Sequence, residues 1–227
     1  MMERVRSLWA GLAGVQGAVP RPGRTSVVVS PGSLLCPPGW VGIVRLEGAT
    51  LATVPDERMA DRVWPALREP DPITALQPVE TLGPAWLAYL DPAEFVPFDG
   101  EVERLPIRHP GIEDLVGRVD PAEAGEAGLD GVTSDAFAVM GAHEVVSVSG
   151  YRPWLDIAAH LSVLTAPGWR GRGHARVAAS AAVVDALDHG LLPQWRARVE
   201  PSRQVARALG FREVGTQLSL RLADTAA

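Results

Sequence analysis

The stretch that most strongly constrains the fold is Trp169-Arg170-Gly171-Arg172-Gly173-His174-Ala175. An apolar, strand-like run (residues 160–165) precedes it, and a helix-like run (residues 175–189) follows it. The first turn of a helix has unpaired backbone N–H groups and a positive partial charge. Glycine lets the backbone approach an anion with no Cβ in the way, and the two arginines add positive charge. This order predicts a site for a phosphate group.

Missing residues narrow the choice of ligand. A Walker A loop needs Gly-Lys-[Ser/Thr], and the chain contains no lysine. A dinucleotide-binding fingerprint needs a third glycine where this chain has Arg176. A diphosphate bound without either pattern suggests coenzyme A.

The loop also fits the pattern [Arg/Gln]-x-x-Gly-x-[Gly/Ala], with Arg170, Gly173 and Ala175 at the specified places. It is preceded by Leu161-Ser162-Val163 and followed by Leu209-Gly210-Phe211. Together these residues resemble the pyrophosphate loop, the preceding Leu-x-Val strand and the later Leu-Gly-Phe helix end of the GNAT superfamily of acyl-CoA N-acyltransferases. The resemblance covers residues 154–222 and becomes faint over 107–153.

The resemblance implies a mixed α/β (α+β) fold, with a mostly antiparallel sheet flanked by helices. It implies transfer of an acetyl group from acetyl-CoA to a primary amine of a small molecule or peptide, without a metal. It also implies that the coenzyme contacts a strand, the loop and the start of the last helix, namely Val163, Leu164, Thr165, Arg170, Gly171, Arg172, Gly173, His174, Ala175 and Ser202.

Three positions depart from the family pattern. Members often carry Asn where this chain has Val199, a proton-donating Tyr where it has Ala206, and a Glu or His base where it has Ile157. We therefore expect no side chain of the last helix to act as an essential general acid. Ser202 is expected to cap that helix.

The remaining candidates for a general base are His160 and Asp156, with Glu200 next. We expect both His160 and Asp156 to lie on the strand that leads to the loop, where their spacing of four residues puts them on one face. That face could be the core, in which case both are structural and need buried partners.

Composition bounds the class of protein. The 227 residues include a single cysteine, Cys36, which excludes an internal disulfide and fits a reducing compartment. No apolar run is long enough to span a bilayer. We therefore expect a cytoplasmic protein without a membrane partner. The sequence leaves open whether it forms a homodimer.

Charge is distributed unevenly along the chain. Residues 1–150 hold 11 arginines and 21 acids, whereas residues 151–227 hold 10 arginines and 6 acids. A basic C-terminal third fits an anionic cofactor. It also raises the alternative of nucleic acid, but no RNA-binding aromatic pattern or finger ligand is present. The acidic overall balance, −6, also argues against nucleic acid as a partner.

The acidic, proline-flanked segment near residue 100 predicts a domain boundary. We expect an N-terminal α/β domain of unknown role over 1–102 and the acetyltransferase domain over 103–227. The first includes a strand at 26–30, a hairpin over 40–54 and a helix over 58–67. In the second, the helix after the loop carries an apolar stripe of Val177, Ala181, Val184 and Leu187.

A second function stays open beside the enzyme. The missing Tyr, Asn and strand acid favour a catalytically weak acyl-CoA-binding regulatory module. A nucleic-acid binder that uses the C-terminal arginines is a third and more distant reading.

Overall fold

The computed structural model describes residues 1–15, 21–69 and 71–223. These residues form two compact units. One comprises the described residues of Met1–Leu87 and Glu213–Ala227, and the other comprises Ala88–Arg212. The predicted boundary at residue 102 divides the chain differently, because it assigns the last strand to the C-terminal domain and residues 88–102 to the N-terminal one.

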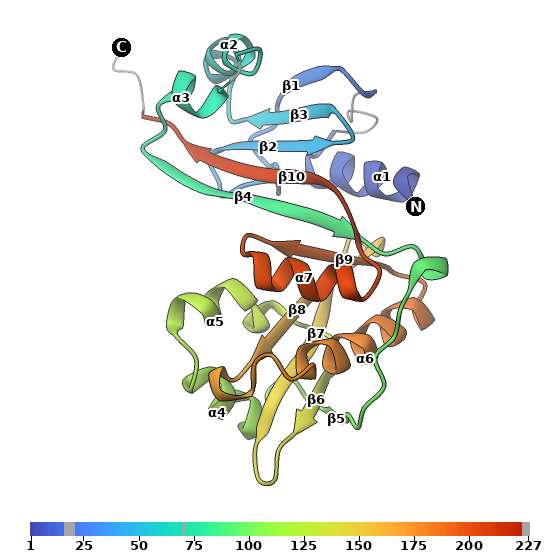
Figure 1. The fold of residues 1–227 in the computed structure, drawn as a ribbon. Helices are drawn as coiled ribbons and strands as arrows, with labels where there is room; N and C mark the ends of the chain where they lie inside the picture. Colours follow the sequence, from blue (N-terminus) through green and yellow to red (C-terminus); the bar gives the residue numbers. More distant parts are fainter. Residues whose placement is uncertain (16–20, 70, 224–227) are drawn as a thin grey trace. The chain divides into compact units, whose positions relative to one another are not determined.

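The N-terminal unit is an α/β sheet with the strand order β1-β3-β2-β10-β4 (Figure 1). Its described elements are α1 (Met2–Leu12), β1 (Thr25–Val29), β2 (Val41–Leu46), β3 (Ala49–Val54), α2 (Glu57–Ala66), α3 (Pro72–Leu76), β4 (Glu80–Tyr89) and β10 (Arg212–Arg221). The predicted hairpin is confirmed as β2 and β3. The strand that follows the last helix, β10, pairs antiparallel with β2, from Gly215 opposite Leu46 to Leu220 opposite Val41.

The C-terminal unit holds a second run of strands, in the order β9-β8-β7-β6-β5. Its described elements are η1 (Pro92–Glu94), β5 (Glu103–Leu105), α4 (Pro110–Gly117), α5 (Pro121–Ala127), η2 (Leu129–Gly131), β6 (Ala136–Met140), β7 (Val145–Trp154), β8 (Ala158–Thr165), η3 (Pro167–Trp169), α6 (His174–Asp188), β9 (Leu192–Ala197) and α7 (Glu200–Ala208). The pairs β5–β6, β6–β7 and β7–β8 are antiparallel, and only β8–β9 is parallel. The predicted mostly antiparallel sheet is confirmed.

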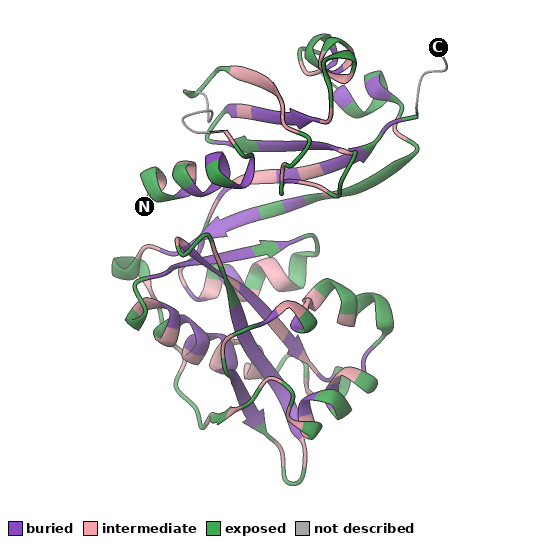
Figure 2. Cartoon of the chain, turned by 180° about the vertical axis from the view of Figure 1, so that it is seen from behind, coloured by how far each residue is buried: buried purple, intermediate pink, exposed green. Residues whose placement is uncertain are grey.

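Successive side chains of β8 point to opposite faces of this sheet, so the strand contributes to two cores, one on each face. Leu161 packs in a core with residues of α6 and α7, including Val183 and Ala206. Leu164 packs on the opposite face with Leu115 of α4. Figure 2 shows these strands as buried along most of their length, with helices on both faces. Helices α6 and α7 therefore share one face, and α4 and α5 lie on the other.

Two local predictions are wrong. The buried face of α6 consists of residues 178–180, 182, 183 and 186, and Val184 of the predicted stripe is 45% exposed. Alanine and valine occur all round this helix, so its sequence does not mark one apolar stripe. Helix α7 begins at Glu200 with Val199 as its N-cap, so Ser202 lies inside the first turn rather than at the cap.

Candidate functional site

Strands β8 and β9 are paired over only the first part of β8. Their parallel register begins with Ala158 opposite Leu192 and ends with His160 opposite Gln194, a point called the apex below. On its other side, β8 stays paired with β7 as far as Thr165. Within the described residues no register with β9 continues beyond the apex, so the edge of residues 161–165 that faces β9 is open. An open strand edge is a template for another extended chain.

The glycine loop links this open edge to α6. Gly171 and Gly173 have φ angles of 74° and 89°, in the left-handed region that favours glycine. Gly173 is also the N-cap of α6, where no side chain accepts a hydrogen bond from the helix. The Arg176 and Val177 N–H groups donate to the Gly173 carbonyl at 2.9 and 3.2 Å. The amides that precede them at the start of the helix are available to an anion, in the field of a 15-residue helix.

The loop and the open edge line one cavity of about 940 Å³. The first turns of α6 and α7, strand β9 and helix α5 complete its wall. Helix α5 is fixed locally, because the Asp120 side chain accepts from the Ala122 N–H at 2.8 Å and Pro121 suits the first helical position. All the residues predicted to contact the coenzyme line this cavity except Arg172. Their contact with a coenzyme stays a prediction.

The arginines of the loop have protein partners. The Arg170 guanidinium forms an ion pair with Glu123 of α5 at 2.9 Å. Arg172 stacks on the Trp169 ring, with its guanidinium carbon 4.9 Å from the ring centroid. Arg176 lies over Phe98 at 4.2 Å. The unpaired first-turn amides of α6 are therefore the clearest anion-binding groups of the loop.

Comparison with known proteins identifies this arrangement. Residues 136–217, from β6 into β10, match the family model described as GNAT acetyltransferase. This chain carries a GNAT acetyltransferase domain. The general reaction of that family is acetyl-CoA-dependent N-acetylation.

Solved structures share the GNAT fold with this chain at low sequence identity. A GNAT-family protein from Novosphingobium aromaticivorans DSM 12444 is 18% identical, with a TM-score of 0.50 over 65% of this chain and 67% of that one. A GNAT-family acetyltransferase from Colwellia psychrerythraea is 8% identical, with a TM-score of 0.51 over 75% of each chain. A search of curated proteins found no match. At these identities the likeness establishes the fold alone.

In the described part of the chain, no helix has the length and apolar character needed to cross a membrane. The His, Cys, Asp and Glu side chains of the same residues form no group of three that could hold a metal ion.

In this GNAT domain, His160 lies at the apex. Its Nδ1 donates to the Gln194 side-chain oxygen, because an amide oxygen only accepts, and this leaves Nε2 as an acceptor. The ring stacks on Trp154 with a centroid distance of 4.2 Å. Burial, followed by the charges of Arg196 and Arg152, lowers the pKa of His160 to about 4. The imidazole is therefore neutral at pH 7 and is a weak base.

The structure does not bring the other predicted base candidates into the cavity. Asp156 is exposed in the turn between β7 and β8, at a φ angle of 52°. It is not on a strand, so the expected shared face with His160 is wrong. Glu200 forms ion pairs with Arg203 and Arg207. None of the three base candidates is among the residues that line the cavity.

Several residues of the cavity wall were not predicted from the sequence. They are Glu123 and Glu126 of α5, Trp195 and Arg196 of β9, and Arg198 beyond its end. Alternation along β9 places Trp195 in the core shared with α6 and α7 and directs Arg196 to the opposite face. The sequence shows only a polar helix and a strand with two arginines, and nothing local indicates that they meet.

We expect His160→Gln to reduce the acid sensitivity of the fold. The folded-state pKa near 4 lies below the ordinary value of 6.5, so the unfolded chain takes up the proton first. Stability is present above pH 6.5 and is lost as the pH falls towards 4. A shift of this size corresponds to a loss on the order of 3 kcal/mol in the wild type.

Urea unfolding from pH 7 to pH 4 measures this difference. Glutamine at position 160 retains a polar group that can reach Gln194 but has no titrating ring. The wild type should lose more stability over this range than the variant. Equal losses in the two proteins would contradict the assignment.

Proposed function

We propose that this protein transfers an acetyl group from acetyl-CoA to a primary amine of a small molecule or peptide. The observation that carries the proposal is the junction of two features in one cavity. A strand edge that opens at the apex leads directly to a glycine loop with unpaired helix amides. The first feature suits an extended amide-containing arm, and the second suits a diphosphate.

Different groups of the chain would bind different parts of acetyl-CoA. The amides at the start of α6 would hold the diphosphate, and the open edge of β8 would pair with the pantetheine arm. From Leu161 to Thr165 the strand extends about 13 Å, at roughly 3.3 Å per residue. The thioester of a bound acetyl-CoA, which supplies the activated acyl group, would then lie towards the apex.

At the apex the acceptor amine would attack the thioester carbonyl. The N–C bond forms as the C–S bond breaks, and the proton of the amine passes to water or to the departing sulfur. Backbone N–H groups near Val163 would stabilise the oxyanion that develops on the carbonyl oxygen. Most of the rate enhancement would come from holding amine and thioester in line.

The proposed reaction needs no acid from α7. Ala206 has no proton to donate, and the Ser202 hydroxyl accepts a hydrogen bond from Trp195 Nε1 at 3.0 Å. A thiol has a pKa near about 8.5, so the departing thiolate needs little assistance. The same facts favour the alternative, a catalytically weak acyl-CoA-binding regulatory module.

An assay of thiol release separates the two functions. The full chain is mixed with acetyl-CoA and a panel of primary amines, and the acetylated product is confirmed by mass spectrometry. An acetyltransferase releases thiol only when both protein and amine are present. Calorimetric binding of acetyl-CoA, without thiol release for any amine, would favour the regulatory module.

We expect Ser202→Ala to change stability more than turnover. The Trp195 side chain is 5% exposed, and the variant leaves its indole N–H without this acceptor. Such a loss costs about 1 kcal/mol. Turnover and acetyl-CoA affinity should both stay within about threefold of the wild type, a difference of under about 0.7 kcal/mol.

Ser202→Thr is the matched variant, because it keeps a hydroxyl at the same position. It should recover most of the lost thermal stability. If Ser202→Ala abolishes turnover while acetyl-CoA affinity is unchanged, the hydroxyl is essential for the chemistry. The prediction that no side chain of α7 acts as an essential general acid would then be wrong.

A further inference from the structure

Two apolar side chains follow the apex directly, one on each strand. Leu161 comes after His160 on β8, and Trp195 comes after Gln194 on β9. Both belong to the core shared with α6 and α7, and both line the cavity. On this face of the sheet, the end of the cavity next to the apex is therefore apolar.

The indole of Trp195 is fixed in its position by two contacts. Its Nε1 donates to the Ser202 hydroxyl of α7 at 3.0 Å. Its ring meets Phe211 edge-on, with a centroid distance of 5.5 Å and an interplanar angle of 69°. Because the side chain is 5% exposed, turning it away would leave a buried N–H without this acceptor. The indole is therefore a rigid part of the cavity wall.

Helix α7 completes this apolar end of the cavity. Val205 and Ala208 line the cavity, and Val205 packs against the same core as the indole. Ala206 and Leu209 are buried in that core together with Trp195. Because protein cores are close-packed, a ligand can extend past the apex on this face only by displacing the indole.

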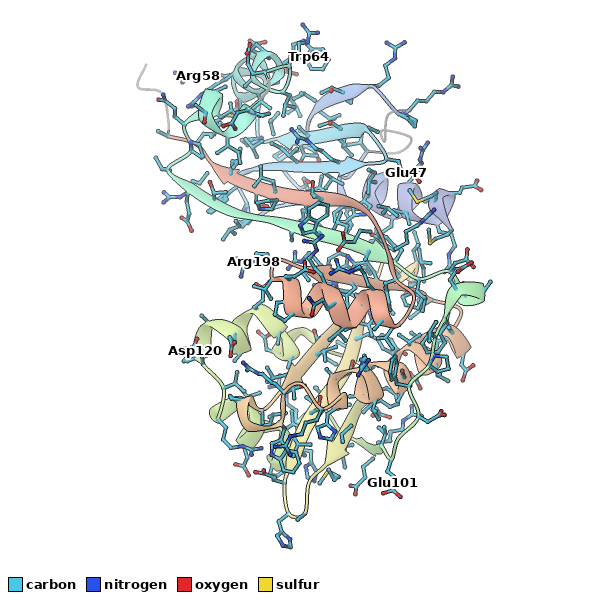
Figure 3. All side chains as sticks on the ribbon, in the orientation of Figure 1. Glu47, Arg58, Trp64, Glu101, Asp120 and Arg198 are labelled. Carbon is cyan, nitrogen blue, oxygen red and sulfur yellow. The ribbon has the colours of Figure 1, made fainter. Side chains whose placement is uncertain are left out.

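The opposite face of the sheet is polar at the same level. Alternation along β9 directs Gln194 to that face, where its side-chain oxygen accepts from His160. Arg198, which is labelled in Figure 3, follows β9 and forms an ion pair with Glu126 of α5. Apolar groups gain from leaving water, whereas burial of a charged amine is costly unless it finds polar partners. An acyl chain is therefore favoured on the side of Leu161 and Trp195.

We propose that Trp195 restricts the donor to short acyl groups, so that acetyl-CoA is used in preference to thioesters of longer fatty acids. This inference rests on the proposed function and adds the residue that determines which acyl group is transferred. The acetyl methyl would lie against Leu161 and Trp195, next to the apex. The indole occupies the space into which further methylene groups would extend.

The test uses coenzyme A thioesters that differ only in chain length. Acetyl-CoA, butyryl-CoA and hexanoyl-CoA are assayed by thiol release with one primary amine, which takes the acyl group from sulfur to its nitrogen in each case. Trp195→Ala removes the indole, and Trp195→Phe replaces it with a smaller ring that still fills much of its place. Trp9→Phe is the matched control, because Trp9 of α1 is fully buried and does not line the cavity.

We expect the wild type to have a kcat/KM for hexanoyl-CoA at least about tenfold below that for acetyl-CoA, or about 1.4 kcal/mol. Trp195→Ala should raise the hexanoyl-to-acetyl ratio of kcat/KM by about tenfold or more, because an apolar pocket distinguishes chains by single methylene groups. Trp195→Phe frees less space, so it should raise the butyryl-to-acetyl ratio by about threefold. Trp9→Phe should change neither ratio. A general loss of stability cancels, because each ratio compares two donors on the same protein.

Calorimetry tests the inference without turnover. Coenzyme A, acetyl-CoA and hexanoyl-CoA are titrated into each protein in the absence of an amine. The wild type should bind hexanoyl-CoA more weakly than acetyl-CoA, and Trp195→Ala should remove the difference while its affinity for coenzyme A stays within about twofold of the wild type. If this preference appears in binding but no amine releases thiol, the proposed reaction is wrong and the acyl-group assignment stands.

Three outcomes would overturn the inference. The first is a wild type that binds and uses hexanoyl-CoA as well as acetyl-CoA. The second is a Trp195→Ala protein that loses affinity for coenzyme A and both thioesters equally, because the indole would then support the arm or the fold and not the acyl group. Far-ultraviolet circular dichroism establishes that each variant is folded. If Trp195→Ala does not fold, Trp195→Phe decides, and an unchanged butyryl-to-acetyl ratio in that variant is the third outcome.

Discussion

Gly173→Asp is expected to weaken acetyl-CoA binding at least tenfold, about 1.4 kcal/mol, in a protein that still folds. Gly173 has a φ angle of 89° and is the N-cap of α6. Aspartate tolerates the left-handed region better than most residues and is a favourable N-cap. Its carboxylate would take the first-turn amides and repel the phosphate that they are proposed to hold.

The control for this variant is Gly168→Asp. Gly168 lies in η3, its φ angle is not in the left-handed region, and a Cβ added there meets no atom within 4 Å. It does not line the cavity. The two variants therefore differ in position and not in the charge added.

Calorimetric titration with acetyl-CoA measures the effect. Gly168→Asp should bind within about twofold of the wild type, under about 0.5 kcal/mol. If a folded Gly173→Asp protein binds acetyl-CoA with unchanged affinity, the assignment of the diphosphate site to this loop is wrong. The proposed function would then lose its main support.

Gly210→Ala is expected to destabilise the fold by about 3 kcal/mol or more, from overlap and backbone strain together. Gly210 has a φ angle of 93°, and a Cβ there would lie 1.9 Å from the backbone oxygen of Glu94. The Val96 N–H donates to the Leu209 carbonyl at 3.1 Å, so the segment after η1 is held against the end of α7. The alanine methyl can be accommodated only if one of these segments moves.

Gly190→Ala is the matched control, because Gly190 also follows a helix and has a φ angle of 71°. A Cβ added there meets no atom within 4 Å. Its cost should be the strain of the left-handed conformation alone, about 1–2 kcal/mol. Thermal unfolding should give the order wild type, Gly190→Ala, Gly210→Ala. Similar melting temperatures for the two variants would show that the close approach to Glu94 is not rigid.

The Leu-Gly-Phe motif shows how much the sequence could reveal. Leu209 and Phe211 are buried in the core that α6 and α7 share, and Gly210 is required by the turn between them. The motif could be recognised because it combines a glycine, required by the left-handed backbone conformation at the turn, with two apolar residues of the core. It does not name the segment that packs against the glycine, which lies more than a hundred residues earlier.

The base candidates show where local reasoning fails. His160 and Asp156 were paired by counting residues along a strand, but the strand begins only at Ala158 and Asp156 belongs to the turn before it. The low pKa of His160 depends on burial and on arginines of two neighbouring strands. Neither cause is visible without the sheet register.

The sequence by itself determined the features that depend on neighbours along the chain. These include the glycine loop before α6, the predicted helix over 58–67, which the structure begins at Glu57, and the hairpin of β2 and β3. Each follows from backbone conformation, capping or short-range alternation, which act over a few residues.

The tertiary structure decided what depends on pairing between distant segments. It placed β10 beside β2, determined the buried face of α6, ended the β8–β9 pairing at His160 and paired Arg198 with Glu126 of α5. Register and burial are properties of the whole packed chain, and they minimise exposed apolar surface and unpaired polar groups over all segments together. A stretch of sequence therefore cannot specify them alone.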